Sequence, residues 1–268
     1  MKIALIILIV LAALVLIGWL GLQIQPAPFP AYAGAPGDIK SMPLPAGLPA
    51  PVERYYRVVY GDQVPVLDTV VITGRGTMKP AFNIALPVRF LIVHNAGRDY
   101  RHYFEATWFG IPILKVDEGF IDGKSFFESP MGTYYDDPNS NQGANLAVWA
   151  EAAWFPALWV TDPRARWQEV DEHTALLFVP FEDGEENFVV RFNHETGIMD
   201  LMEAMRFRGN TDSQKVLWLT YGAPDAASGG DSFAMWLDAG KPWLKFNIES
   251  MVFNADVSEF IRGRGYDR

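Results

Sequence analysis

The segment that decides the fold is residues 70–108, VVITGRGTMKPAFNIALPVRFLIVHNAGRDYRHYFEATW. Apolar side chains recur in it at every second position, with wetter side chains between them. A period of two is that of a β-strand, because successive side chains point to opposite faces of a sheet. The positions that share one face are Val70, Ile72, Gly74, Gly76 and Met78, then Val88, Phe90, Ile92 and His94, then Tyr100, His102, Phe104, Ala106 and Trp108. These residues therefore predict three antiparallel strands joined by short connections.

The same signals continue along the chain. Further strands are predicted at residues 113–120, 124–128, 174–181, 187–193, 198–207, 216–221 and 243–254. Asp122-Gly123 is a strong two-residue hairpin signal. No helical pattern of about ten residues interrupts residues 70–128, so an antiparallel meander is favoured over a parallel α/β sheet. A small-residue loop is expected at residues 226–230, and a brief helix followed by a charged tail at residues 256–268.

Two helices are expected beside the sheet. The first covers residues 52–60, and the second follows capping residues 139–141 and runs through residues 144–154. The second is apolar nearly all round, with Glu151 as its only charge, so it belongs in the interior. The predicted fold class is α+β, with a curved, half-barrel-like antiparallel sheet packed on a few helices. It forms a single exported domain over residues 53–268.

The N-terminus carries an uninterrupted apolar segment. No charged or strongly polar side chain occurs between Ile3 and Leu22, and about 20 helical residues span about 30 Å, the thickness of bilayer hydrocarbon. We expect a transmembrane anchor over residues 1–24. A cleaved signal peptide is the alternative, because Ala31-Tyr32-Ala33 fits a cleavage site.

The charge before the apolar segment predicts how the anchor is oriented, and the composition of the residues after it predicts a tether. Lys2 precedes the single span, which predicts a cytoplasmic N-terminus and a domain on the extracytoplasmic side of the cell (inner) membrane. Residues 25–52 are rich in Pro, Ala and Gly, and are expected to form a semi-rigid tether.

Composition excludes several function classes. The chain has 268 residues, 50% of them hydrophobic, a net charge of −10 and no Cys. The lack of Cys excludes disulfides, thiolate metal sites and thiol catalysis. The acidic balance argues against a nucleic-acid partner. Neither a G-x-S-x-G nucleophile motif nor a phosphate-binding P-loop occurs, and no cofactor is expected.

The histidines supply the main metal candidate. His94 and His102 flank one hairpin turn, with Asp99 nearby, which makes a site of two histidines and one carboxylate conceivable. The i, i+4 spacing of helical zinc sites is absent, so no metal is predicted. Residues 137–141 match the opening of a calcium loop, but its required Gly and Glu are missing further on. Helix capping explains these residues more simply.

Glu151 is the one charge on the predicted central helix. Burial raises the pKa of a carboxyl group unless a cation meets it, and such groups serve both catalysis and structure. A structural ion pair with Arg75, Arg89 or Arg101 is the simpler interpretation.

Aromatic residues mark the candidate ligand site. Of the 9 tryptophans, all but Trp19 lie beyond the apolar segment. An aromatic sheet face covered by the central helix encloses either a packed core or a ligand cavity. The predicted ligand-binding residues are Phe90, Phe104, Trp108, Trp149, Glu151 and Trp154, and no catalytic residue is assigned.

Four segments resemble a bacterial family known only as a domain of unknown function. They are residues 48–57 (LPAPVERYYR), 145–156 (NLAVWAEAAWFP), 161–167 (TDPRARW) and 188–192 (FVVRF). The resemblance covers most of residues 48–255 and implies an N-terminal span in many members, but no activity. The predicted sheet also resembles the half-barrels of periplasmic lipoprotein and lipid carriers.

Together these features favour a membrane-anchored, exported, non-enzymatic domain that binds an apolar ligand, either a lipid or a lipid-modified partner. One alternative is a hydrolase of the bacterial envelope that uses Glu151 or a His94/His102 site. The other is an envelope assembly or scaffold protein.

Overall fold

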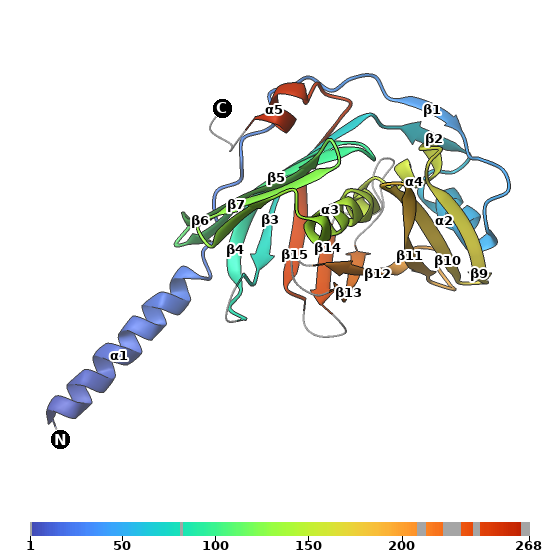
Figure 1. Cartoon of the computed structure of the whole chain (residues 1–268). Coiled ribbons are helices and arrows are strands. Elements are labelled where there is room, and N and C mark those ends of the chain that lie inside the picture. The colour runs from blue at the N-terminus through green and yellow to red at the C-terminus, as the bar shows by residue number, and fades with distance from the viewer. Residues whose placement is uncertain (1, 81–82, 208–212, 222–231, 238–241, 264–268) are drawn as a thin grey trace.

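The computed structural model describes residues 2–80, 83–207, 213–221, 232–237 and 242–263. A long N-terminal helix projects from a domain built on one large curved sheet (Figure 1). The helix, the antiparallel sheet and the few packed helices confirm the predicted α+β class. The loop expected at residues 226–230 and the tail at residues 264–268 lie outside the described residues.

The main sheet has 13 strands, and its paired strands run antiparallel. Their order is β8-β7-β6-β5-β4-β3-β15-β14-β13-β12-β11-β10-β9. The first half of the chain builds the sheet outward from β3 to β8, and the second half returns from β9 to β15, which pairs with β3. The strands are β3 (Thr69–Met78), β4 (Leu86–Asn95), β5 (Asp99–Trp108), β6 (Ile111–Ile121), β7 (Lys124–Ser129), β8 (Gly132–Tyr135), β9 (Arg166–Asp171), β10 (Thr174–Phe181), β11 (Gly184–Phe192), β12 (Met199–Phe207), β13 (Ser213–Tyr221), β14 (Ser232–Leu237) and β15 (Leu244–Phe253).

The remaining elements surround this sheet. Strands β1 (Lys40–Pro43) and β2 (Gln63–Val66) form a separate pair. The helices are α1 (Lys2–Gly21), α2 (Ala50–Val59), α3 (Pro138–Ala150), α4 (Leu158–Thr161) and α5 (Ser258–Arg262), and a 3-10 turn, η1 (Glu151–Trp154), continues α3. The structure confirms every strand and both helices that the pattern predicted. It adds β1, β2, β8, β9 and β14.

Helix α3 lies against the concave side of the sheet (Figure 1). Its N-cap is Asp137, whose Oδ1 accepts a hydrogen bond from the Ser140 backbone N at 2.9 Å, and Pro138 occupies the first turn. The helix therefore begins slightly before the predicted capping residues, and the calcium-like sequence is a helix cap. Residues 140–150 are all buried, as expected for a helix that is apolar nearly all round.

The convex side carries a second, smaller core. Residues 24–37, called the strap below, run across it together with α5 (Figure 1). Phe29 of the strap is 6% exposed; its ring centroid lies 5.9 Å from that of Tyr103 and 4.3 Å from the Arg89 guanidinium. The Pro26 and Ala27 carbonyls accept hydrogen bonds from Arg75 and Arg89 at 3.0 and 3.2 Å.

This packing differs from the spacer expected for the Pro-rich segment. A Pro-rich chain forms no regular backbone hydrogen bonds of its own, so its carbonyls are available to donors from the sheet. The strap is consequently part of the domain surface.

Candidate functional site

A cavity of about 280 Å³ lies between the concave face of the sheet and α3. Most of its wall is apolar or aromatic, and the wall also includes the polar residues His102, Glu118, Glu151 and Arg206. The apolar and aromatic wall consists of Met78, Pro80, Phe104, Leu114, Val116, Phe127, Met131, Tyr134, Ala147, Trp154, Trp218, Met235, Trp243, Leu244 and Phe246.

Three of the predicted ligand-binding residues line this cavity: Phe104, Glu151 and Trp154. Phe90 lies behind the wall, where its ring stacks on Phe246 with the centroids 4.1 Å apart. Trp149 is fully buried beneath the Arg164 guanidinium, which lies 5.7 Å from its ring.

Trp108 lies outside the cavity. It ends β5 and remains 40% exposed. Its indole Nε1 donates a hydrogen bond to the Gly18 carbonyl of α1 at 3.0 Å. Alternation places a residue on a face of the sheet, but it does not tell how far the covering helix extends.

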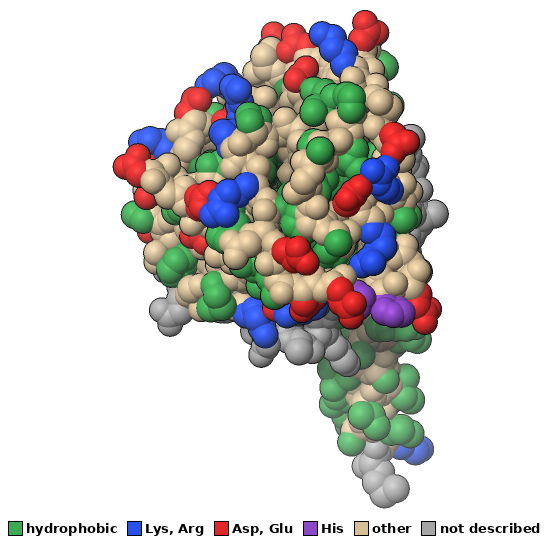
Figure 2. All heavy atoms as spheres, turned by 90° about the vertical axis from the view of Figure 1, so that its right-hand side faces the viewer, with side chains coloured by type: hydrophobic (Ala, Val, Ile, Leu, Met, Phe, Trp, Pro, Cys, Tyr) green, Lys and Arg blue, Asp and Glu red, His purple; other side chains and the backbone are tan. Residues whose placement is uncertain are grey.

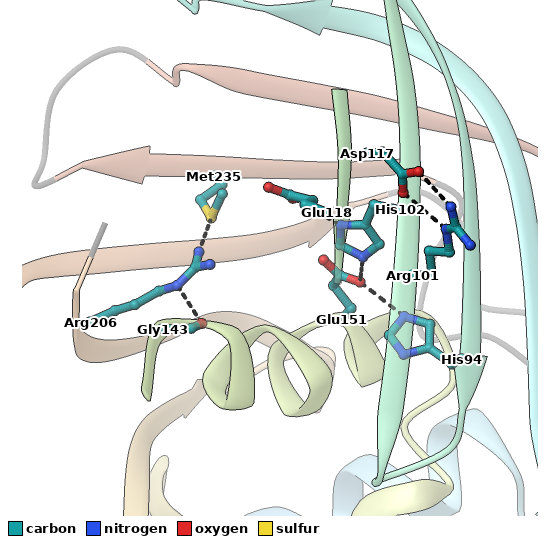
Figure 3. Close-up of polar contacts among 9 residues, drawn as sticks. All are labelled: His94, Arg101, His102, Asp117, Glu118, Gly143, Glu151, Arg206 and Met235. Carbon is teal, nitrogen blue, oxygen red and sulfur yellow. Dashed lines mark hydrogen bonds and ion pairs between the residues drawn. The ribbon is translucent and has the colours of Figure 1, made fainter. Parts of the chain in front are cut away.

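Two histidines converge on Glu151 (Figure 3). The Oε2 atom of Glu151 lies 2.9 Å from Nε2 of His94 and 2.8 Å from Nε2 of His102. His94 comes from β4 and His102 from β5, and Glu151 begins η1. In the register of β4 and β5, His94 pairs with Tyr100 and Ile92 pairs with His102, so the imidazoles are diagonal neighbours on the concave face.

The predicted ion pair between Glu151 and an arginine is wrong. Arg75 pairs with Glu249 at 2.6 Å, Arg89 with Glu105 at 2.6 Å and Arg101 with Asp117 at 2.5 Å. The three arginines hold odd positions in strands whose even positions face α3, so their side chains lie on the convex side.

Asp99 is excluded from the histidine cluster by the same alternation. Its carboxylate accepts hydrogen bonds from the Asn95 side-chain amide at 2.8 Å and from the Asp122 backbone N at 2.9 Å. Glu151 therefore takes the place of the carboxylate that the sequence suggested beside His94 and His102.

His94, His102 and Glu151 are almost inaccessible to solvent, and burial opposes a charge on each of them. For His94 burial outweighs the attraction of Glu151, so the pKa of this imidazole is lowered. Burial acts in the same direction on His102, but the Glu151 charge and hydrogen bonds to Glu118 and Glu151 raise the pKa of His102 to about 9. Burial also opposes the Glu151 charge, but the two imidazoles lower the pKa of its carboxyl to about 2. The metal-free cluster is thus an ion pair between Glu151 and His102, with His94 as a neutral third member.

Sequence reasoning missed Glu118 and Arg206, although a signal was present for both. Glu118 shares its face of β6 with Leu114 and Val116, and Arg206 shares its face of β12 with Met202 and Ala204. A charge at an alternating apolar position marks a polar group directed toward the interior.

Arg206 stands apart from the acidic groups of the cavity (Figure 3). Its Nε donates to the Gly143 carbonyl of α3 at 2.8 Å, and its Nη1 lies 3.8 Å from the Met235 sulfur. Among the described residues its contacts are therefore with uncharged acceptors. The cavity wall thus holds a cation that has no described carboxylate within ion-pair distance.

Comparison with known proteins places the chain in a family. The model of a family of unknown function, DUF6544, matches residues 38–224, so the chain belongs to that family. The membership predicted from residues 48–57 and 145–156 is confirmed. No curated protein sequence matches the chain.

Two solved structures are similar to the chain at low identity. A LolA superfamily protein from Nitrosomonas europaea is 9% identical, with a TM-score of 0.40, and the match covers 75% of this chain and 91% of that one. A domain described as an outer membrane lipoprotein-sorting protein, from Vibrio parahaemolyticus, is 10% identical, with a TM-score of 0.40 and coverage of 76% and 90%.

Proposed function

We propose that this DUF6544 protein is a membrane-anchored, exported domain that binds one acyl chain of an amphipathic lipid, or of a lipid-modified partner, between its sheet and α3. The observation that carries this proposal is the cavity of about 280 Å³ on the concave face, whose wall is mostly apolar and includes a few polar groups. A largely apolar pocket with few polar groups is the usual form of a small-molecule site, and this volume is close to the lower end of the usual range, about 300–1,000 Å³. This volume suits a single acyl chain.

The N-terminal helix supports the membrane part of the proposal. α1 has 20 residues, is long and apolar enough to cross a bilayer, and none of its most apolar stretch is buried in the domain. Figure 2 shows its surface as almost uniformly hydrophobic, in contrast to the mixed charges of the domain. Lys2 at its start favours a cytoplasmic N-terminus, which puts the domain on the extracytoplasmic side.

A second apolar feature lies where α1 leaves the domain. The turn between β5 and β6 presents Trp108, Phe109, Ile111 and Ile113, which are 40%, 37%, 66% and 56% exposed and are called the hairpin tip below. The Phe109 backbone N donates to the Gly21 carbonyl at 2.9 Å, so the tip sits against the last turn of α1 (Figure 1). Phe109 has a φ of 53°, a conformation that favours Gly, Asn or Asp. An exposed aromatic residue at such a position suits contact with the lipid interface.

The cavity extends toward that same end of the sheet. Met78 ends β3 and Leu244 begins β15, opposite each other in the register, and both line the cavity. Leu114, another wall residue, pairs with Ala106 two residues before the hairpin tip begins. A lipid that enters at this end needs to leave the bilayer only partly before its chain meets the apolar wall.

The test is lipid binding by the full chain in mild detergent or nanodiscs. Native mass spectrometry is expected to show co-purified lipid, and a fluorescent fatty acid is expected to bind saturably at about one per chain. Leu114→Asp places a charge on the cavity wall and is expected to weaken binding at least about 10-fold, since burying an unpaired polar group costs a few kcal/mol. Met205→Asp is the matched control, because Met205 is 55% exposed and lies outside the cavity wall. Absence of both co-purified lipid and saturable binding would overturn the proposal.

A second candidate function is a hydrolase of envelope material. The observation in its favour is the convergence of His94, His102 and Glu151 at the cavity. Glu151→Gln separates the two functions. If the protein is a hydrolase, the wild type hydrolyses acyl ester substrates and the variant does not. If it is a binding protein, neither protein hydrolyses them, and the variant still binds the fluorescent fatty acid.

A further inference from the structure

The geometry assigns a divalent transition-metal site to His94, His102 and Glu151. One ligand atom from each residue, the two imidazole Nε2 atoms and a carboxylate oxygen, lies within 4.8 Å of the others. The three residues come from two adjacent strands and the turn that continues α3, so regular elements on opposite sides hold the donors in place. This site does not depend on the ligand of the cavity.

The two distances from the Glu151 oxygen are slightly shorter than an ion requires. Zinc bonds of about 2.0–2.2 Å in tetrahedral geometry separate the ligand atoms by about 3.4 Å. The Glu151 oxygen lies 2.9 and 2.8 Å from the two nitrogens. The carboxylate therefore has to withdraw by about half an ångström, which a change of its side-chain torsions provides.

Charge also favours a divalent cation here. The site combines one nearly buried carboxylate, Glu151, and one partly exposed carboxylate, Glu118, whose side chains are 12% and 31% exposed, with two imidazoles that are 0% and 3% exposed. With neutral imidazoles as ligands, one divalent ion balances the two carboxylate charges.

Glu118 acts as a positioning residue for this site. His102 Nδ1 lies 3.1 Å from Oε1 of Glu118 while its Nε2 faces Glu151. A carboxylate on the far nitrogen fixes the tautomer and orientation of a metal-binding histidine and strengthens it as a ligand.

The donor set indicates the class of metal. Two nitrogens and one carboxylate oxygen, in a chain that has no Cys, suit zinc or another borderline divalent ion such as iron or cobalt. His102 and Glu151 both line the cavity, so the remaining coordination position faces it and is open to water or another oxygen donor. Glu151 lies far along the chain from the two histidines, which is why no metal motif marks the three ligands together.

The first experiment measures zinc and cobalt binding by the metal-stripped full chain in detergent. We expect one zinc per chain by calorimetry, with proton release detected by comparing buffers of different ionisation enthalpy, because metal displaces protons from the imidazoles. Cobalt is expected to give visible absorption bands of low coordination number. A folded wild-type chain that binds neither ion at one per chain overturns the inference.

The chain supplies its own control for adventitious histidine binding. The sequence has 4 histidines, and the other two, His173 and His194, lie with their rings 5.2 Å apart at the surface. The double variant His173→Gln/His194→Gln is expected to keep the bound zinc unchanged. Loss of binding in that variant assigns the metal to the surface pair and overturns the inference.

Two further variants test the roles of the carboxylates. Glu151→Gln is expected to lower zinc affinity by at least about 100-fold. Glu118→Gln, at a partly exposed position that tolerates the change, is expected to lower it about 10- to 100-fold, as is typical for a residue that orients a ligand. It is also expected to shift the cobalt bands. Unchanged affinity in both folded variants overturns the assignment.

Discussion

Arg206 gives the cavity a feature that ordinary apolar pockets lack. Its guanidinium contacts a carbonyl and a thioether, and within the described chain no carboxylate lies within ion-pair distance of it. A buried or half-buried cation of this kind is stabilised by an anion, and a hydrogen bond to a charged group contributes about 1.5–3 kcal/mol. The acidic end of a lipid is therefore expected to meet Arg206.

This expectation predicts a selective effect of Arg206→Gln. Binding of a fatty acid is expected to weaken about 10- to 100-fold, while binding of the fatty alcohol of equal length changes little. The neutral Gln amide still donates to the Gly143 carbonyl of α3, which limits the structural cost. Competition with a fluorescent acyl probe measures both affinities. An equal loss for acid and alcohol would show that Arg206 shapes the cavity and does not bind the anion.

His102 predicts the pH dependence of stability in the metal-free protein. Its pKa is about 9 in the folded chain and near 6.5 in the unfolded chain, so its contribution is complete below pH 6.5 and is lost as the pH rises through 9. The loss is on the order of 3 kcal/mol. Urea unfolding with a chelator present, between pH 6 and 10, measures it. His102→Gln is expected to be less stable below pH 7 and to lack this alkaline decline; an identical decline in both proteins contradicts the prediction.

The residues of the cluster show where prediction from sequence stops. Alternation placed His94 and His102 on one face correctly, and it also held the information that Arg75, Arg89 and Arg101 face the other way. The alternation gave no information on how far α3 and η1 extend over the concave face of the sheet. The meeting of Glu151 with the histidines is a property of helix docking, which depends on side chains far apart in sequence.

Among the elements, the strap is the segment where the structure differs from the free spacer that its composition predicts. Proline-rich sequence predicts an extended chain, and the chain is extended, but Phe29 anchors it in the convex core. Strands with clear alternation were predictable, whereas β9 is an edge strand whose side chains are mostly exposed and carries little alternation. Strands as short as β1 and β2 are too short to show a clear alternation, so the sequence alone does not identify them.

Phe29→Ala is expected to release the strap while leaving the main core intact. The change removes a buried ring and its contacts with Tyr103 and Arg89, and a buried Phe→Ala change costs about 3–5 kcal/mol where the site cannot collapse. Limited proteolysis is expected to cut within residues 24–37 several-fold faster than in the wild type. Pro28→Ala serves as the control. Equal cleavage in Phe29→Ala and wild type would show that α5 alone holds this surface.

For the whole molecule, the hairpin tip predicts how the domain meets the bilayer. Its four apolar side chains gather where α1 ends, and the chain's lack of Cys allows a single label to be introduced at any site. Ile111→Cys with a nitroxide label is expected to be accessible to oxygen and shielded from a polar relaxation agent in proteoliposomes. Val170→Cys, 53% exposed on β9 at the far edge of the sheet, is expected to show the opposite. Equal access of the polar agent to both labels contradicts the membrane contact.

The attachment of the strap limits how far the domain can travel. A free chain of about 28 residues would let a domain roam about 30 Å from its anchor. Here the Gly21 carbonyl is held by the hairpin tip and the following residues are fixed to the convex face, so that reach is lost. With α1 in a bilayer, as proposed, the domain therefore stays close to the membrane surface. Under the proposed function, a ligand that leaves the cavity therefore has to be accepted by a partner that reaches the domain at that surface.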